Sequence, residues 1–402
     1  MDPVRNPFAP GAGTPPPELA GRADVIEAGT VALQRLAAGR PTQSLILVGL
    51  RGVGKTVLLN KLNDVAETSG FKSAMVEAHE GKTLPELIVP PLRAALLQLS
   101  AVENAKDKAR RGLRALKGFV NGLNVKFGEI DVGISMDAEG GVADSGNLEH
   151  DLPDLIVAVA EAAKAAGRPL SLFLDELQYL TSEEFSALIM AVHRINQKQL
   201  PFILVGAGLP QILGLAGNSK SYSERLFRYP EIGALTEKDA VSALRNPAVE
   251  EGVEFTDAAI EVIIKLTERY PYFLQQWAYE AWNIASNNII DIGIMNTASA
   301  KAVTELDKSF FKVRFDRCTP SEKRYMRALA ELGSGKHRSG DVAEKLGVKV
   351  TSGAPTRSAL IKKGMIYSPS HGDTAFTVPL FDQYMRRTMA LDVGDVEDER
   401  ED

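Results

Sequence analysis

With 402 residues, the chain is long enough for two or three domains that each bury a hydrophobic core. Its single cysteine, Cys318, excludes an internal disulfide and favours a reducing compartment. No apolar run reaches the length of a membrane span, and the N-terminus lacks the charged-then-apolar pattern of a signal peptide. We therefore expect a cytoplasmic protein that has no membrane partner.

Charge is distributed unevenly along the chain, although the net value is only −6. Residues 312–390 contain 15 Lys and Arg against 7 Asp and Glu, which is a local balance of +8. Residues 391–402 contain 7 acids and 1 Arg, which is a balance of −6. A basic block beside an acidic tail favours one surface for a polyanion and a tail that competes for that surface.

The first 20 residues are rich in Pro, Gly and Ala, a composition that predicts a flexible leader. From 21 to 233, strand-like apolar runs alternate with helical patterns, as is typical of a doubly wound parallel sheet in an α/β domain. Residues 104–146 form an insertion in this pattern. Its basic helix at 106–117 offers either a second polyanion surface or a solvated face, and a short hairpin is predicted at 121–135.

The most specific motif of the chain lies between a strand pattern at 45–48 and a helical pattern that begins near Lys55. It has the form G-x-x-x-x-G-K-T and consists of Gly49, Leu50, Arg51, Gly52, Val53, Gly54, Lys55 and Thr56. Its glycines let successive backbone N–H groups face a phosphate, and the helix that follows adds the positive end of its dipole. Lys55 is expected to reach the β- and γ-phosphates, and the Thr56 hydroxyl to ligate Mg²⁺.

A second diagnostic segment is the apolar run 169–174, which ends in Asp175 and Glu176. In a parallel sheet, active groups gather at the carboxyl ends of the strands. Asp175 can hold Mg²⁺ through a water molecule, opposite Thr56, and Glu176 can polarise the water that attacks the γ-phosphate. A solvated acidic turn is the alternative, and the phosphate loop makes it the weaker interpretation.

Two further regions follow the predicted sheet. Residues 234–310 are helical almost throughout, which indicates a small helical bundle. In residues 311–390 a helix, a short helix, a further helix at 351–363 and a hairpin follow one another, which is the plan of a winged helix-turn-helix. The acidic tail, 391–402, comes last.

These features together resemble the AAA+ ATPases of the Orc1/Cdc6-like branch, and equally the related STAND signalling NTPases. The resemblance covers residues 20–390 approximately and rests on the phosphate loop, the Asp175-Glu176 strand, the helical segment and the winged helix. It implies an AAA+-like P-loop ATPase core at 21–233, a helical lid at 234–310, and ATP with Mg²⁺ between them. It also implies that Arg22 lies near the adenine and that Pro271 is the lid proline that contacts nucleotide.

The resemblance also implies assembly into a homo-oligomer, in which Arg225 or Arg228 is the arginine finger that reaches a neighbour's γ-phosphate. A surface salt bridge is the alternative role for each arginine. One feature departs from the family pattern, because the strand that ends in Gly206-Ala207-Gly208 lacks the polar residue usual for sensor 1. This departure favours slow ATP hydrolysis.

For the winged helix, the resemblance and the local charge predict contacts with double-stranded DNA. The candidates lie at helix starts, in the turn, on the second helix of the turn motif and at the wing tip: Arg338, Ser339, Lys349, Thr351, Arg357, Lys362, Lys363 and His371. The predicted function is an ATP-binding, slowly hydrolysing switch that couples nucleotide state to DNA binding. The alternative is a STAND-like signalling or defence ATPase whose winged helix mediates autoinhibition or contacts a protein partner.

Overall fold

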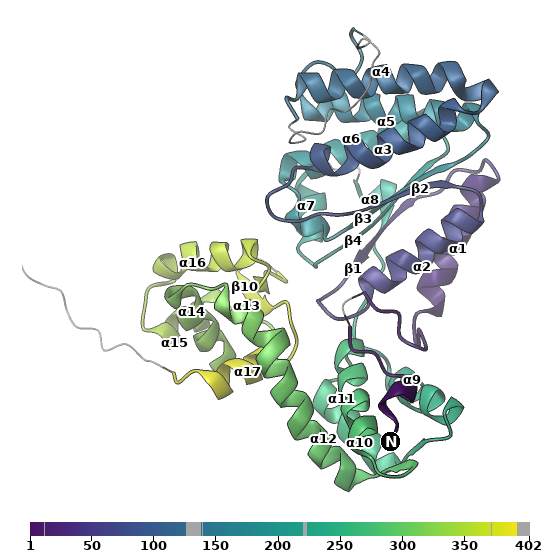
Figure 1. Cartoon of the computed structure of the whole chain (residues 1–402). Helices are drawn as coiled ribbons and strands as arrows, with labels where there is room; N and C mark the ends of the chain where they lie inside the picture. The colour runs from purple at the N-terminus through teal and green to yellow at the C-terminus, as the bar shows by residue number, and fades with distance from the viewer. Residues whose placement is uncertain (12, 126–137, 139, 220–222, 371, 392–402) are drawn as a thin grey trace, which may run out of the picture. The chain divides into compact units, whose positions relative to one another are not determined.

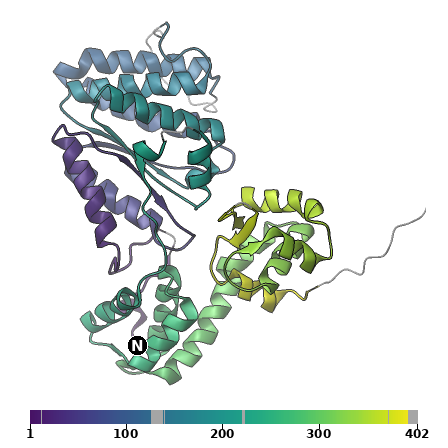
Figure 2. The same cartoon turned by 180° about the vertical axis from the view of Figure 1, so that it is seen from behind.

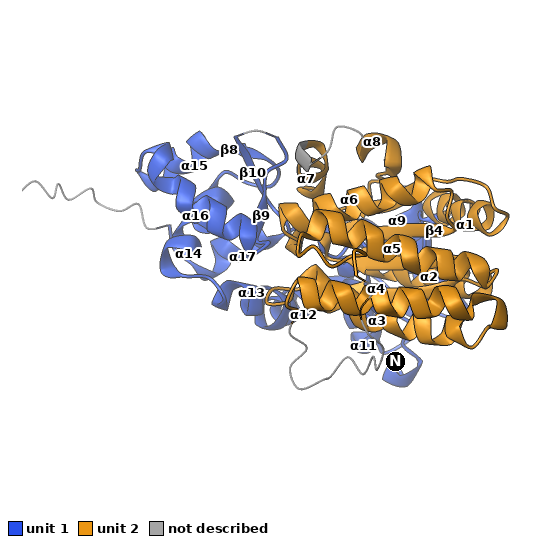
Figure 3. Ribbon diagram, turned by 90° about the horizontal axis from the view of Figure 1, so that it is seen from above, with its two compact units in different colours: residues 1–22, 50–54, 232–402 blue, residues 23–49, 55–231 orange. Residues whose placement is uncertain are grey.

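The computed structural model describes residues 1–11, 13–125, 138, 140–219, 223–370 and 372–391 (Figure 1). Two compact units make up the chain, coloured orange and blue in Figure 3. We call them the α/β unit (residues 23–49 and 55–231) and the lid–wing unit (residues 1–22, 50–54 and 232–402). Most of the predicted hairpin, most of the acidic tail and the wing-tip residue His371 lie outside the described residues.

The α/β unit is built on a five-stranded parallel sheet with the strand order β2-β3-β4-β1-β5. Every residue of β1, β3 and β4 is buried, because helices cover both faces of a parallel sheet and leave no solvated side. The carboxyl ends of these strands therefore share one edge of the sheet. The strands are β1 (Ser44–Val48), β2 (Lys72–Glu77), β3 (Leu170–Asp175), β4 (Phe202–Gly208) and β5 (Phe227–Arg228).

Helices cover the two faces of this sheet in unequal depth. Figures 1 and 2 show α1 and α2 on one face and α3, α5 and α6 on the other, with α4 packed outside α3 and α5. The α/β fold predicted from the alternating pattern is confirmed. The helices are α1 (Ala23–Ala37), α2 (Lys55–Thr68), α3 (Leu84–Ser100), η2 (Glu103–Ala105), α4 (Lys106–Gly122), α5 (Leu148–Ala165), η3 (Leu177–Tyr179), α6 (Ser182–Gln197), α7 (Ile212–Ser219) and α8 (Ser223–Leu226).

The lid region of the second unit consists of helices with side-chain caps. Thr236, Thr256 and Asp291 each accept a hydrogen bond from a backbone N–H in the first turn of the helix that follows, which stabilises the helix start. Two short parallel strands tie the loops between these helices together. The elements are α9 (Glu237–Glu250), β6 (Glu254–Phe255), α10 (Asp257–Thr267), α11 (Pro271–Ile284), β7 (Ile289–Ile290) and α12 (Ile292–Glu305).

The N-terminal segment packs on this lid, although its composition predicts a flexible leader. Phe8 is 1% exposed and meets the ring of Phe255 edge-on, with ring centroids 6.0 Å apart. The Asn6 amide donates to the Tyr279 carbonyl at 3.1 Å, and a short 3-10 helix, η1 (Pro3–Arg5), precedes it. A single buried aromatic side chain thus anchors a stretch that is otherwise rich in Pro and Gly.

The winged helix follows the lid through a π-helical segment, η4 (Leu306–Phe311), and α13 (Lys312–Asp316). Three helices and a small antiparallel sheet of order β8-β10-β9 alternate as the winged-helix plan requires, which confirms that prediction. A final helix packs on the first helix of the domain. The elements are α14 (Pro320–Glu331), β8 (His337–Arg338), α15 (Ser339–Leu346), α16 (Val350–Lys362), β9 (Ile366–Tyr367), β10 (Asp373–Phe376) and α17 (Phe381–Thr388).

Candidate active site

The phosphate loop joins β1 to α2, so Lys55 and Thr56 occupy the first turn of a helix, where backbone N–H groups and the helix dipole favour anions. Lys55 is 7% exposed, and its Nζ donates to the carbonyl of Gly49 at 3.0 Å. The Thr56 hydroxyl donates to Oδ2 of Asp175 at 2.6 Å. The two predicted metal-site residues, 119 positions apart in sequence, therefore meet in the fold.

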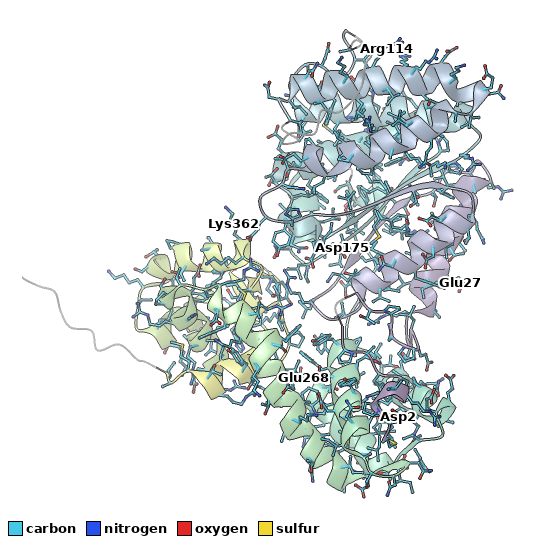
Figure 4. All side chains as sticks on the ribbon, in the orientation of Figure 1. Asp2, Glu27, Arg114, Asp175, Glu268 and Lys362 are labelled. Atoms are coloured by element: carbon cyan, nitrogen blue, oxygen red, sulfur yellow. The ribbon has the colours of Figure 1, made fainter. Side chains whose placement is uncertain are left out.

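Asp175 ends β3 and is 4% exposed; Figure 4 labels it at the edge of the sheet. Burial raises the pKa of its carboxyl, the hydrogen bond from Thr56 opposes this shift, and the neighbouring Glu176 adds to it. A carboxylate beside a hydroxyl supplies the oxygen ligands that Mg²⁺ prefers. These residues fit a Mg²⁺ ion, whose charge would offset the cost of keeping the Asp175 carboxylate ionised in a buried place.

Glu176 lies in a strained backbone conformation at the same edge of the sheet. Its φ is +54°, in the left-handed region that non-glycine residues rarely adopt. Its N–H donates to Oδ1 of Asp175 at 2.7 Å, and its carboxylate accepts a hydrogen bond from the side-chain amide of Gln178. Such strain is concentrated at functional sites, because the surrounding structure must hold it in place.

Within the lid–wing unit, the middle of the phosphate loop is held by the predicted nucleotide residues or their neighbours. The Arg22 guanidinium donates to the carbonyl of Val53 at 3.3 Å. Pro271 begins α11, and the next residue, Tyr272, donates its backbone N–H to the Gly52 carbonyl at 3.2 Å. Gly52 has a φ of +80°, and a Cβ at that position would lie 3.1 Å from Cβ of Tyr272. The loop therefore requires glycine here both for its conformation and for this contact.

The winged helix also contacts the phosphate loop inside this unit. The N–H of Arg51 donates to the carbonyl of Thr377 at 3.1 Å. Thr377 is fully buried, and its hydroxyl donates to the Gly364 carbonyl at 2.6 Å, so its backbone is held firmly by the winged-helix domain. One residue of the loop is thus hydrogen-bonded to the domain for which DNA contacts are predicted.

Arg225 and Arg228 are exposed and lie away from this centre. Arg228 belongs to β5, whose residues pair with Ser44 and Leu45 at the start of β1, whereas the phosphate loop follows the end of β1. Its Nε donates to Oε1 of Gln43 at 3.1 Å. Both arginines thus lie near the amino end of β1, whereas Asp175 lies at the carboxyl end of β3. Either arginine could therefore act as a finger only on the site of a neighbouring molecule.

The predicted DNA contacts divide into two groups. Exposed side chains occur at the start of α15, in the turn and along α16, and Figure 4 labels one of them, Lys362. This exposed group consists of Arg338, Lys349, Thr351 and Lys362. Three other predicted residues, Ser339, Arg357 and Lys363, make hydrogen bonds inside the domain.

Arg357 makes most of these internal bonds. Its guanidinium donates to the Thr374 hydroxyl at 2.8 Å, to the Ser368 hydroxyl at 2.9 Å and to the Asp373 carbonyl at 2.7 Å. It thereby ties α16 to the wing strands. Lys363 donates to the buried carboxylate of Glu322 at 2.7 Å.

Two residues of the site were not predicted from the sequence. Gln178 contacts the Glu176 carboxylate, and Tyr272 contacts the phosphate loop through its backbone. For Gln178, the available signal is its place two residues after Glu176 in the turn that leaves β3. For Tyr272, the only signal is its position next to Pro271.

Across the residues that the structure describes, no group of three or more His, Cys, Asp or Glu side chains is arranged to hold a metal ion. None of the described helices is both long and apolar enough to cross a membrane.

Comparison with protein families identifies the class of the α/β unit. Residues 18–205 match the AAA ATPase domain, and they form such a domain here. Residues 308–385 match a family described only as a domain of unknown function (DUF8462). Among curated protein sequences, none matches this chain.

One solved structure shares the fold over most of the chain, and two others align with the chain at TM-scores below 0.5. The Walker-type ATPase PABY2304 of Pyrococcus abyssi is 13% identical with a TM-score of 0.58, and the alignment covers 93% of this chain and 97% of that one. The Orc1 protein of Aeropyrum pernix, solved in complex with DNA, is 16% identical with a TM-score of 0.48, covering 93% and 94%. The RuvB Holliday junction branch migration motor of Thermotoga maritima is 15% identical with a TM-score of 0.42, covering 91% and 95%. At these identities the likeness concerns the fold alone.

Proposed function

We propose that this protein is an ATP-hydrolysing switch whose nucleotide state controls DNA binding by the winged helix. The observation that carries the ATPase assignment is the 2.6 Å hydrogen bond between Thr56 and Asp175. It brings the hydroxyl that ends the phosphate-loop motif to the carboxylate that ends β3. Oxygen ligands, the buried Lys55 ammonium and a helix N-terminus thus lie at one edge of the sheet.

In the proposed reaction each residue has a separate task. Thr56 and Asp175 would hold Mg²⁺, whose charge would neutralise the phosphate oxygens when it is bound. Lys55 exchanges its bond with the Gly49 carbonyl for the β- and γ-phosphates. The Glu176 carboxylate takes a proton from a water molecule as the water oxygen bonds to the γ-phosphorus. The bond from that phosphorus to the β–γ bridging oxygen then breaks, leaving ADP and phosphate.

Coupling to the winged helix is supported by a chain of contacts in the lid–wing unit. Tyr272, whose N–H donates to Gly52 of the phosphate loop, stacks on Phe310 with ring centroids 4.7 Å apart. Phe310 lies in the π-helical segment η4, and the Arg314 guanidinium lies 4.0 Å from its ring centroid. A π-helical turn is an uncommon, often functional irregularity where one helix passes into the next. A nucleotide that rearranges the phosphate loop would act on this junction through Tyr272.

DNA is the proposed polyanion because the exposed polar side chains of α16 and of the turn before it (residues 347–362) are basic or neutral. Arg338, Lys349 and Lys362 are exposed, and the domain carries the +8 balance found in the sequence. The exposed face of α16 is otherwise formed by small residues such as Thr351 and Ser358, which offer little for reading base edges. We therefore propose phosphate contacts that depend on salt more than on DNA sequence.

ATP turnover by the purified full chain, with and without duplex DNA, tests this function. We expect DNA to change the turnover rate, and Glu176→Gln to lower turnover by about 100- to 10,000-fold in both conditions. A gel shift at several salt concentrations then reports phosphate contacts through the slope of affinity against salt. Turnover at the wild-type rate in Glu176→Gln would refute the catalytic assignment, and DNA-independent turnover with no gel shift would refute the coupling.

A second candidate function is favoured by the hydrogen bond between Arg51 and Thr377. In this version the winged helix restrains the phosphate loop, and a protein partner releases it, as in a signalling ATPase. Thr377 contributes only its backbone carbonyl to this bond, so a side-chain substitution there does not remove it cleanly. Faster nucleotide exchange after removal of residues 308–402, without any DNA effect in the full chain, would favour this candidate.

A further inference from the structure

The side chain of Gln178 connects the two strand ends that flank the reaction centre. Its amide nitrogen donates to the carboxylate of Glu176, and its amide oxygen accepts the backbone N–H of Leu209 at 3.0 Å. Leu209 follows directly after β4, the strand beside β3 in the sheet. Both ends of the Gln178 carboxamide are thus fixed, one by the expected general base and the other by the backbone at the end of β4.

The two glycines of β4 make room for this arrangement. A Cβ at Gly208 would lie 3.3 Å from the Gln178 amide oxygen and 3.4 Å from Cβ of Leu177. A Cβ at Gly206 would collide with the Leu177 side chain. The turn η3, which carries Leu177 and Gln178, therefore packs directly on the backbone of β4, in space that side chains on this strand would otherwise fill.

We infer that Gln178 is the positioning residue of the ATPase centre. It orients the Glu176 carboxylate at a place where β4 supplies no polar side chain. This inference rests on the proposed ATP hydrolysis and names the group that orients its general base. The left-handed backbone of Glu176 sets where its side chain leaves the chain, and the hydrogen bond from Gln178 restrains the direction of its carboxylate. The carboxamide suits this task, because it donates to Glu176 while it accepts from Leu209.

The arrangement also links the general base to a movement of β4. A change at the end of β4 moves Leu209, which moves the Gln178 amide oxygen and, through the rigid carboxamide, its bond with Glu176. Catalysis is sensitive to such changes, since a general base contributes only when it lies within hydrogen-bonding reach of the water proton. Gln178 touches neither nucleotide nor metal in this scheme and acts through Glu176.

Two substitutions separate positioning from packing. Gln178→Leu removes both hydrogen bonds and keeps a similar volume. Gln178→Glu keeps an oxygen for the Leu209 N–H but presents a carboxylate instead of an N–H donor to Glu176. We expect each variant to lower kcat by about 10- to 100-fold, while the dissociation constant for MgATP stays within about twofold of the wild-type value. Gln197→Leu, at an exposed glutamine on α6, is the matched control and should change neither quantity.

The readouts are phosphate release for kcat and titration with a fluorescent ATP analogue for binding, both on the full chain. Wild-type kcat in Gln178→Glu would overturn the inference alone, because the bond with Glu176 would then be irrelevant to turnover. A loss of ATP binding as large as the loss of kcat would also overturn it, since Gln178 would then only support the fold of the site. Wild-type protein that hydrolyses ATP no faster than Lys55→Ala would refute the proposed function itself, and the inference with it.

Discussion

Site residues were predicted in two regions, at the carboxyl ends of the sheet strands in the α/β unit and on the surface of the winged helix. The two regions differ in how the fold arranges these residues. At the sheet edge, predicted residues from distant parts of the sequence meet, as Thr56 and Asp175 show. In the winged helix, predicted residues of one helix separate, with Lys362 exposed and Arg357 bonded inside the domain. Local motifs that each place a residue at the carboxyl end of a parallel strand indicate that these residues meet. A basic side chain alone does not indicate whether it faces solvent or the interior of its own domain.

The largest effects are expected at the sheet edge. Lys55→Ala removes the buried ammonium that would face the β- and γ-phosphates, so we expect ATP binding to fall below detection. Glu176→Gln keeps the size of the side chain but removes the base, and we expect turnover to fall by about 100- to 10,000-fold with binding retained. Calorimetry with MgATP and phosphate release measure the two quantities. If Glu176→Gln lost MgATP binding as completely as Lys55→Ala, Glu176 would serve binding and not catalysis.

A matched pair on α16 tests the contrast within the winged helix. Arg357→Leu removes three hydrogen bonds to the wing, and we expect it to lower the unfolding free energy of this domain by about 2 kcal/mol. Lys362→Ala, one turn and a half further along, changes an exposed side chain and should alter stability by less than about 0.5 kcal/mol. Chemical denaturation followed by tyrosine and tryptophan fluorescence compares the two. Similar stabilities would show that the internal bonds of Arg357 contribute little.

The exposed lysines of this surface should contribute little to stability but directly to DNA binding. Lys349→Ala and Lys362→Ala each remove one proposed phosphate contact, so each should weaken DNA binding uniformly across sequences. The slope of log affinity against log salt should fall by about 1 for each substitution. Fluorescence anisotropy with labelled duplexes at several salt concentrations measures it, and Lys82→Ala, a lysine of the α/β unit, is the control. Unchanged slopes would move the DNA contact away from α16.

Sequence and structure differ most where a contact depends on the fold. The phosphate loop and the Asp175-Glu176 pair could be predicted, because a local pattern places each of them at the end of a strand. The role of Gln178 could not be predicted, since it depends on the backbone of Leu209, 31 residues later, and on the two glycines of β4, which leave space beside that strand. Composition likewise predicts a flexible leader, because composition does not indicate that one side chain of this segment, Phe8, is buried against the lid.

The smallest expected effect concerns the ion pair that fixes Lys363, another basic residue directed inward. Glu322 is 4% exposed and accepts from Lys363 at 2.7 Å. Burial favours a higher pKa for Glu322, but the hydrogen bonds from Lys363 and from the Thr319 N–H outweigh it and hold the pKa below its ordinary value. A lowered pKa means that the folded state favours the carboxylate. Its stabilising contribution is therefore present above the ordinary glutamate pKa, about 4.3, and is lost as the pH falls through the lowered value.

Glu322→Gln should accordingly lower the melting temperature at pH 7 by about 2–4 °C and have little effect near pH 3. Differential scanning calorimetry of both proteins across this pH range gives the difference at each pH. Glu344→Gln, at an exposed position on α15, controls for the loss of a surface charge and should leave the melting temperature unchanged at either pH. If the difference between wild type and Glu322→Gln stays constant as the pH falls, the glutamate acts through packing and its capping hydrogen bonds. In that case the inward direction of Lys363 does not depend on charge, and the contrast between the two regions would rest on Arg357 alone.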